Sequence, residues 1–360
     1  MQKLSVGVVG CGNICPIYLK NLTTLFPDIE VLAVSDRTGD RAKARAAEFG
    51  IPRACTVSEI LADQRIDAVL NLTVPLAHAE ITEAALAAGK SVYGEKPLAV
   101  TLAQGERLVD LARERKMTLG SAPDTFLGAG IQTCRALIDE GAIGDPIGGS
   151  AFMVCGGHES WHPDPEFYYK KGGGPVLDMG PYYITALVAL LGPVARVQGV
   201  ARKTFDERTI TSQPKRGSRI HVEVPTHATG LLEFAGGAAV TIVMSFDGPG
   251  GTARDPIEIT GTEGTLVVPD PNTFGGPVKL RKRGAAGWTD VPLRFPYAEN
   301  LRGLGLADMT RAIRQNAAPR AGGDMALHVL EVMHGIHAAS GAGSVYAVRH
   351  TCERPEAMPS

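Results

Sequence analysis

Short apolar runs alternate with stretches of helical periodicity over residues 1–125. The run LSVGVVG, residues 4–10, is apolar without a break, as expected of a strand covered on both faces of its sheet. Further strand-like runs lie at residues 31–36, 53–55, 67–73, 91–96 and 117–122. Between them, apolar positions recur with helical spacing over residues 13–25, 40–49, 78–88 and 102–116. This alternation predicts a doubly wound parallel sheet with right-handed crossovers.

The pattern changes beyond a linking helix expected at residues 129–140. Apolar and polar residues then alternate with a period of two at residues 148–154, 195–201, 226–234, 237–246, 256–261 and 264–268. Gly236-Gly237 between two of these stretches is typical of a hairpin. Helices are expected at residues 181–191, 304–317 and 325–340, and we expect the last two to pack back on the core. The predicted fold class is α/β, with one domain at residues 1–125 and an α+β domain with an open, mostly antiparallel sheet at residues 126–360.

Composition and charge narrow the class of protein. Against 36 Lys and Arg residues stand 38 Asp and Glu residues, so the chain lacks the basic excess of a nucleic-acid or anionic-membrane binder. No apolar window approaches the ~20 residues that cross a bilayer, and no secretory signal is visible. The six cysteines form no CxxC pair, which favours isolated thiols in a reducing compartment. We expect a soluble, cytoplasmic protein without nucleic-acid or membrane partners.

A glycine-rich turn follows the first strand. The segment Gly10-Cys11-Gly12-Asn13-Ile14-Cys15 resembles the GxGxxG or GxGxxA fingerprint of Rossmann dinucleotide-binding domains. Gly10 would make the tight turn, and Gly12 would let the backbone approach a pyrophosphate at the helix N-terminus. Cys15 departs from the fingerprint at a position that serves helix–strand packing, where a small thiol can substitute. Asp36 ends the next strand, about 20 residues on, where an acid binds the adenosine ribose hydroxyls.

The acidic residue also bears on the choice of cofactor. Asp36 favours NAD, because its carboxylate repels the 2′-phosphate of NADP. Arg37 and Arg41 leave NADP open, since either would bind that phosphate. For His78, which begins a predicted helix, a structural role is as open as a functional one. The candidate cofactor-binding residues are Gly10, Gly12, Asn13, Ile14, Asp36, Arg37, Thr73, Pro75, His78, Glu95 and Lys96.

A lysine stands at the end of the fifth predicted strand, in Glu95-Lys96-Pro97. Ligands of an open parallel sheet bind beyond the carboxyl ends of its strands, so Lys96 is placed to face a bound cofactor. The motifs occur in the order GCGNIC, Asp36, Thr73-Val74-Pro75 with His78, Glu95-Lys96-Pro97, and Gly172-Gly173-Gly174 before Asp178-Met179-Gly180-Pro181-Tyr182. Together they resemble the glucose–fructose oxidoreductase/inositol dehydrogenase/rhizopine-catabolism (Gfo/Idh/MocA) family over essentially the whole chain.

The resemblance implies a Rossmann domain, a second domain with an open sheet, and a nicotinamide cofactor. It also implies hydride exchange with a hydroxyl carbon of a sugar, cyclitol or related polyol. The family's lysine corresponds to Lys96 and its aspartate to Asp178. Four residues on, many members carry a histidine as general acid/base, whereas this chain has Tyr182, as glucose–fructose oxidoreductase-like and dihydrodiol dehydrogenase-like members do. The resemblance and the open sheet face together suggest a homodimer or homotetramer.

The residue types support the same catalytic candidates. We expect Pro181 to occupy the first turn of a helix, where its missing N–H is harmless. Asp178 and Tyr182 are four residues apart and so share one side of that helix start. Oxidation of an alcohol needs a proton acceptor near the hydroxyl, and a tyrosine, with an ordinary pKa of about 10, needs a cation to serve near neutrality. We expect Lys96 to supply that charge and Asp178 to orient Lys96 or the substrate, with the substrate carbon between Lys96 and Tyr182.

A polar, aromatic loop lies between a strand and the glycine-rich segment, at residues 157–165. Trp161 could stack on a sugar face, and His158 or His162 could bond hydroxyl groups. The alternative is a surface loop whose shape is set by its prolines. The two histidines are four residues apart, but Pro163 and Pro165 argue against a metal-binding helix, and we expect no metal site.

Two other classes of function compete with a dehydrogenase. One is a cofactor-binding sensor or scaffold that has lost turnover, which the presence of Lys96, Asp178 and Tyr182 disfavours. The other is an enzyme that holds NAD tightly and oxidises a sugar only transiently, since the same residues would begin that chemistry. Cofactor retained through purification would favour the latter.

Overall fold

The computed structural model describes residues 3–359, which form two compact units. The first unit comprises the chain up to Leu127 together with Glu299–Leu327, and the second comprises Gly128–Ala298 and His328–Ser360. Within residues 3–359, none of the helices is both long enough and apolar enough to span a membrane.

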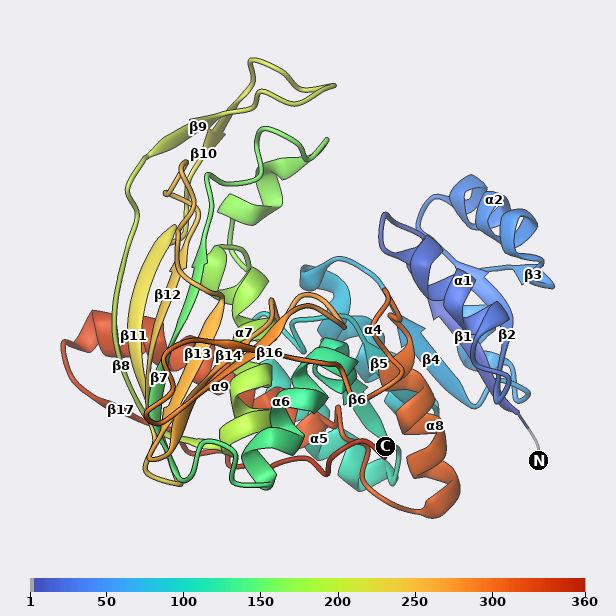
Figure 1. Cartoon of the computed structure of the whole chain (residues 1–360). Helices are drawn as coiled ribbons and strands as arrows, with labels where there is room; N and C mark the ends of the chain where they lie inside the picture. Colours follow the sequence, from blue (N-terminus) through green and yellow to red (C-terminus); the bar gives the residue numbers. More distant parts are fainter. Residues whose placement is uncertain (1–2, 360) are drawn as a thin grey trace. The chain divides into compact units, whose positions relative to one another are not determined.

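The first unit is built on a parallel sheet with strand order β3-β2-β1-β4-β5-β6 (Figure 1). Its strands are β1 (Leu4–Val9), β2 (Ile29–Ser35), β3 (Arg53–Ala54), β4 (Ala68–Asn71), β5 (Ser91–Gly94) and β6 (Leu119–Ser121). The side chains of β1 and β4 are buried on both faces, Val6, Val8 and Leu70 completely, which explains their unbroken apolar sequences. The predicted doubly wound parallel sheet is confirmed.

Helices connect these strands and pack on the sheet. They are α1 (Cys15–Thr24), α2 (Gly39–Phe49), α3 (Val57–Ala62), α4 (Pro75–Ala87) and α5 (Leu102–Arg115). A 3-10 turn, η1 (Thr125–Leu127), follows β6. Helix α4 begins three residues before the predicted start at His78, because Pro75 supplies a preformed first turn.

The returning segment of the first unit adds helix α8 (Leu304–Gln315). Asp124, which follows β6, accepts hydrogen bonds from the backbone N–H groups of Gly303 (2.9 Å) and Gly305 (3.0 Å) at the start of α8. The edge of the sheet is also paired, since Gly120 forms a bridge with Gly322. A buried carboxylate thus anchors a helix that lies about 180 residues further along the chain.

The second unit contains a mixed sheet with strand order β16-β15-β14-β13-β7-β12-β11-β8-β17, and β9 pairs separately with β10. Its strands are β7 (Pro146–Val154), β8 (Val194–Arg202), β9 (Glu207–Thr209), β10 (Arg219–His221), β11 (His227–Phe234), β12 (Ala239–Ser245), β13 (Ile257–Gly261), β14 (Gly264–Val268), β15 (Val278–Lys282), β16 (Thr289–Val291) and β17 (Tyr346–Ala347). Neighbouring strands are antiparallel except β7 and β12, so the predicted mostly antiparallel sheet is confirmed. The hairpin predicted at Gly236-Gly237 joins β11 to β12.

Helices of the second unit are α6 (Ala129–Asp139), α7 (Pro175–Leu191) and most of α9 (Gly323–Ala342), with a 3-10 helix η2 (Pro165–Tyr169) before α7. Helix α7 contacts β7, β11 and β12, and the alternate residues Leu232, Val240 and Ile242 are buried beneath it. The opposite face of these strands remains partly exposed.

The predicted start of α7 is wrong. Pro181 was expected in the first turn, but the helix begins at Pro175 and Pro181 lies inside it. The helix starts earlier because Gly174 adopts a φ of 87°, which breaks the extended chain, and Pro175 then fits the first turn. Asp178 therefore lies in the first turn of α7, and Tyr182 lies one turn later.

Candidate functional site

The glycine-rich turn of the first unit leaves room for a ligand at one glycine only. Gly10 has a φ of +103°, and a Cβ atom there would lie 2.5 Å from the carbonyl carbon of Leu72. A Cβ atom on Gly12 would meet no atom within 4 Å. Gly10 is thus required by the fold, whereas Gly12 leaves the backbone open beside the N-terminus of α1, as a pyrophosphate needs.

Two thiols fill the inner side of this turn. Cys11 and Cys15 are completely buried, and the Cys11 Sγ donates to the carbonyl oxygen of Ser35 over 3.5 Å. A hydrogen bond between the two thiols lowers the pKa of Cys11 and, with burial, raises that of Cys15. Cys15 therefore serves as a packing residue at the third position of the fingerprint.

Asp36 lies directly after β2 and fixes the turn. Its Oδ2 accepts a hydrogen bond from the Cys11 N–H (2.9 Å), and its Oδ1 accepts one from the Thr38 N–H (2.8 Å). Arg41 Nη1 lies 3.6 Å from the same carboxylate, while Arg37 is exposed. Because each carboxylate oxygen has two lone pairs, both can still accept a ribose hydroxyl.

His78 joins two loops at the carboxyl edge of the sheet. Its Nδ1 lies 2.7 Å from the carbonyl oxygen of Pro97, and its Nε2 lies 3.0 Å from that of Thr73. The ring is buried, which lowers its pKa. Thr73 is itself tied to the Asn71 side chain through its N–H and hydroxyl groups. With both nitrogens facing the backbone, His78 holds the loops that follow β4 and β5.

Glu95 anchors the predicted catalytic lysine. Its Oε1 accepts a hydrogen bond from the Tyr18 hydroxyl (2.7 Å), and its Oε2 accepts one from the Lys96 N–H (3.0 Å). Tyr18 is completely buried, and burial raises its pKa well above the usual value. Sequence reasoning missed Tyr18, because nothing in a helical pattern distinguishes a tyrosine that bonds a carboxylate from one that merely packs.

Two apolar side chains at the start of α4 were also missed. Val74 is 65% exposed and Leu76 is 67% exposed, on either side of Pro75. Exposed apolar side chains beside a ligand-binding edge are well suited to cover a planar ring. The sequence carries no signal for them, since exposure is set by the tertiary fold.

In the second unit, backbone conformation and close packing explain the three glycines before α7. Gly172 and Gly174 have φ values of 89° and 87°. A Cβ atom on Gly173 would lie 2.4 Å from the carbonyl oxygen of Phe167. This tight passage delivers the chain to the first turn of α7, where Asp178 stands.

His158 meets Asp178. The His158 Nε2 lies 3.3 Å from the Asp178 Oδ2, and both side chains are mostly buried. Tyr182, one turn along α7, is 8% exposed, and Tyr183 donates its hydroxyl proton to the carbonyl oxygen of Phe152 (3.3 Å). The structure thus brings two of the predicted site residues into direct contact across 20 positions of sequence.

Around this pair lies a group of aromatic rings. The rings of Trp161, His162, Phe167 and Tyr168 are each within 5.4 Å of a neighbouring ring in the cluster. Trp161 is 60% exposed and Phe167 is 42% exposed. His162 Nδ1 accepts a hydrogen bond from the Asp164 N–H (3.0 Å), which leaves its Nε2 for other contacts. Lys96 belongs to the first unit and Tyr182 to the second, and their partnership stays a prediction.

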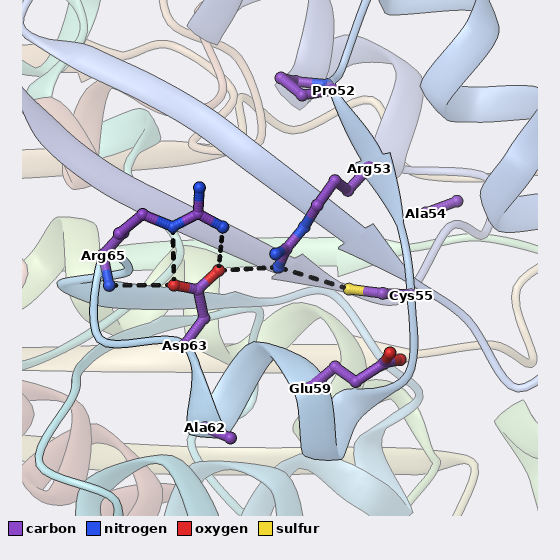
Figure 2. Close-up of a pocket in the computed structure, with 8 residues that line it drawn as sticks. All are labelled: Pro52, Arg53, Ala54, Cys55, Glu59, Ala62, Asp63 and Arg65. Carbon is purple, nitrogen blue, oxygen red and sulfur yellow. Dashed lines mark hydrogen bonds and ion pairs between the residues drawn. The ribbon is translucent and has the colours of Figure 1, made fainter.

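A surface pocket of about 690 Å³ lies elsewhere on the first unit, beside β3 and α3. Figure 2 shows Arg53 and Arg65 on either side of Asp63. The Nη2 atom of each arginine lies 2.8 Å from the Asp63 Oδ2. These bonds hold the pKa of Asp63 well below its usual range. None of the predicted site residues lines this pocket, whose residues are Pro52, Arg53, Ala54, Cys55, Glu59, Ala62, Asp63 and Arg65. Both arginines of this pocket pair with Asp63.

Two family descriptions match consecutive parts of the chain. Residues 4–122 match an oxidoreductase family with an NAD-binding Rossmann fold, and residues 131–267 match the GFO/IDH/MocA C-terminal domain. The chain belongs to the GFO/IDH/MocA family. As a member of this family it is an NAD-binding oxidoreductase, which confirms the resemblance and the cofactor inferred from the sequence.

Named relatives of this GFO/IDH/MocA protein act on sugars. It is 30% identical over 301 residues to 1,5-anhydro-D-fructose reductase from Ensifer adhaerens, an alignment that covers 82% of this chain and 84% of the relative. It is 34% identical over 200 residues to dTDP-3,4-didehydro-2,6-dideoxy-alpha-D-glucose 3-reductase from Streptomyces violaceoruber. That alignment covers 55% of this chain and only 58% of the relative.

A solved structure shows the same fold. The NAD binding oxidoreductase from Klebsiella pneumoniae superposes with a TM-score of 0.84 at 21% identity, covering 96% of this chain and 99% of that one.

Proposed function

We propose that this enzyme transfers hydride between NAD and a hydroxyl or keto carbon of a sugar, cyclitol or related polyol. The observation that carries the proposal is the contact of Asp178 with His158 at the start of α7, with Tyr182 one turn along the same helix. Two relatives are named as reductases of sugar carbonyls, which supports this class of substrate.

Gly12 and Asp36 would hold the pyrophosphate and the adenosine ribose of the cofactor, and the loops that His78 and Glu95 fix would hold its nicotinamide end. When bound, the nicotinamide supplies the hydride acceptor or donor. Asp36 favours NAD over NADP because its carboxylate repels a 2′-phosphate. Arg41, which reaches the same carboxylate, is the residue that would accommodate such a phosphate.

Lys96 and Tyr182 handle the proton, and Asp178 orients the reacting groups. As hydride leaves an alcohol carbon, the hydroxyl proton must pass to a base within hydrogen-bond reach. We assign that role to the Tyr182 hydroxyl, made a usable acceptor by the ammonium group of Lys96. A tyrosine in place of the histidine of many family members changes the atom that takes the proton, not the reaction.

The exposed aromatic rings of Trp161 and Phe167 favour a sugar as the substrate. Trp161 and Phe167 present apolar faces of the kind on which the C–H side of a sugar ring stacks, and His162 offers a ring nitrogen to a hydroxyl group. The direct test is a panel of D-glucose, D-galactose and myo-inositol with NAD, and 1,5-anhydro-D-fructose with NADH, followed by the ultraviolet absorbance of NADH. Turnover of none of them, with NAD bound, would contradict the proposed substrate class.

The proposal extends to the oligomeric state and the cellular compartment of the enzyme. We place the enzyme in the cytoplasm because its six cysteines are free thiols. The sheet face opposite α7 presents Val200, 68% exposed, with Leu231 and Val243 half-buried, which supports self-association as a homodimer or homotetramer. Light scattering measures that state, and a monomer at micromolar concentration would contradict it.

A further inference from the structure

His158 is held in one place by its aromatic neighbours. Ring centroids of Tyr168, Phe246 and Trp161 lie 4.0, 4.6 and 5.3 Å from its own. The side chain is 12% exposed, so the imidazole cannot swing into solvent without breaking this packing.

The two ring nitrogens have different surroundings. Nε2 faces the Asp178 carboxylate at 3.3 Å, whereas Nδ1 is buried with no hydrogen-bond partner among residues 3–359. A carboxylate can only accept, so Nε2 carries the hydrogen and donates it to Asp178. A hydrogen on Nδ1 would be a buried donor without an acceptor, which is costly. The geometry therefore assigns the hydrogen to Nε2.

A buried charge network fixes the backbone on both sides of His158. Arg208, from β9, donates to the carbonyl oxygen of Gly156 (3.1 Å) and to the Glu159 carboxylate (2.6 Å). Its other terminal nitrogen bonds Asp247 and the carbonyl oxygen of Phe246. The Arg208 guanidinium group thus holds Gly156 and Glu159, on either side of His158. It also holds the chain at Phe246, whose ring packs on the His158 ring.

A tyrosine completes the support. The Tyr169 hydroxyl accepts a hydrogen bond from the His158 N–H (3.2 Å) and donates its own hydrogen to Glu159. Burial raises the pKa of Tyr169, so the hydroxyl stays protonated and keeps this direction of donation. These hydrogen bonds and ion pairs hold the loop around His158 more firmly than an ordinary surface turn is held.

We propose that His158 is a positioning residue for Asp178: it donates from Nε2, holds the carboxylate in one rotamer and keeps it ionised, while Arg208 fixes the loop that carries it. This inference rests on the proposed function, in which Asp178 orients the proton transfer. It differs from the hydroxyl contact expected from the sequence, because it directs His158 to a protein carboxylate rather than to the substrate.

The pH dependence of turnover separates this role from simple packing. A donor to a carboxylate favours its charged form, so loss of the donor makes Asp178 protonate at higher pH. The other titratable or charged groups around the pair are Cys155, Glu159, His162, Asp164, Tyr168, Tyr169, Tyr182, Arg208 and Asp247. Burial lowers the pKa of His162 and raises that of Cys155, so both stay uncharged near neutrality.

The variants His158→Phe and His158→Gln test the proposal in turnover. The first keeps a ring without a donor, and the second keeps a donor that does not titrate. With the fastest compound of the panel above, His158→Phe should lower kcat about 10- to 100-fold and move the acid limb of the kcat profile up by ~1 pH unit, with KM for NAD unchanged. His158→Gln should restore most of kcat and the position of the limb. His221→Gln removes an exposed histidine of β10 that does not bond Asp178, so the limb should stay in place.

A second measurement needs no substrate. In protein labelled with ¹⁵N-histidine, the one of nine histidine signals that is absent in His158→Gln should show its hydrogen on Nε2 at pH 8, and it should lose that preference in Asp178→Ala. A hydrogen on Nδ1, or His158→Phe and His158→Gln profiles that superpose on the wild type, would overturn the inference. Wild-type kcat in Asp178→Ala would instead overturn the role of Asp178 in the proposed function. Loss of activity in Asp178→Ala with an unshifted His158→Phe profile would overturn this inference alone.

Discussion

Replacing each of the two glycines of the nucleotide turn by alanine should have opposite effects. At Gly12 the new methyl group meets no atom within 4 Å, and the backbone is not in the left-handed region. Because alanine restricts the unfolded chain, Gly12→Ala should leave the apo protein as stable as the wild type or up to about 1 kcal/mol more stable. The same methyl group would stand where the pyrophosphate approaches, so the NAD dissociation constant should rise at least about tenfold, or ~1.4 kcal/mol.

Gly10→Ala should instead damage the fold. Its φ of +103° costs an L-residue about 1–2 kcal/mol. Its Cβ atom would also lie 2.5 Å from the carbonyl group of Leu72, which is backbone and cannot move aside cheaply, for about 1–3 kcal/mol more. The loss of unfolding free energy should therefore be about 2–5 kcal/mol.

The two effects are measured separately. Urea denaturation without cofactor gives the stability of each variant, and calorimetric titration gives its NAD affinity. In a thermal melt at NAD concentrations ~100 times the wild-type dissociation constant, the wild type gains about 2.7 kcal/mol, and a tenfold weaker Gly12→Ala should lose about half of that gain. If Gly12→Ala binds NAD as the wild type does, or is destabilised as much as Gly10→Ala, the assignment of Gly12 to the pyrophosphate is wrong.

Four further predictions concern other parts of the two units. Asp36→Ala should weaken NAD more than NADP, and the ratio of the two dissociation constants by titration cancels any general damage to the turn; an unchanged ratio contradicts the ribose assignment. Burial raises the pKa of Asp124 to about 6. Its contribution to the free energy of unfolding is therefore complete below pH ~4 and falls by up to ~3 kcal/mol as the pH rises through 6. Asp124→Asn should lack this fall in denaturation from pH ~4 to ~8, and parallel pH curves for the variant and the wild type would refute the prediction. Lys96→Ala and Tyr182→Phe should each lower kcat by ~10²–10⁴ with NAD affinity nearly intact, and the double variant should lose much less than the product, whereas multiplicative losses would mean that the two act independently. Arg208→Met leaves two buried carboxylates unpaired and should cost about 3–5 kcal/mol of unfolding free energy in urea; a loss below ~1 kcal/mol would contradict the network.

The sequence by itself determined the layout of the first unit. Unbroken apolar runs such as residues 4–9, each followed by a helical period, specify parallel strands and crossovers, because a strand buried on both faces has no polar face to show. The order of the glycine turn, Asp36 and Lys96 follows from this layout, since parallel strands bring their carboxyl ends to one edge. These signals are local in sequence, so the sequence alone is sufficient to predict them.

Helix boundaries were determined less well. The α7 start was placed at Pro181, because a proline often opens a helix, yet Pro175 opens it and Pro181 is tolerated inside. Which proline begins the helix depends on Gly174, which has a positive φ and where a Cβ atom would lie 2.9 Å from the Pro225 carbonyl oxygen, 51 residues away in sequence. A local pattern does not contain that contact.

Only the tertiary structure decided which polar groups meet. His158 and Asp178 were both named from the sequence, but as parts of different roles, and their contact depends on how the loop after β7 packs on the start of α7. Arg208, in a strand that pairs with neither element, gave no signal at all. Buried polar groups must find partners wherever the fold brings them, and those partners lie tens of residues apart in the chain. The sequence therefore specifies the elements and the chemistry they carry, while long-range packing selects the partners that orient it.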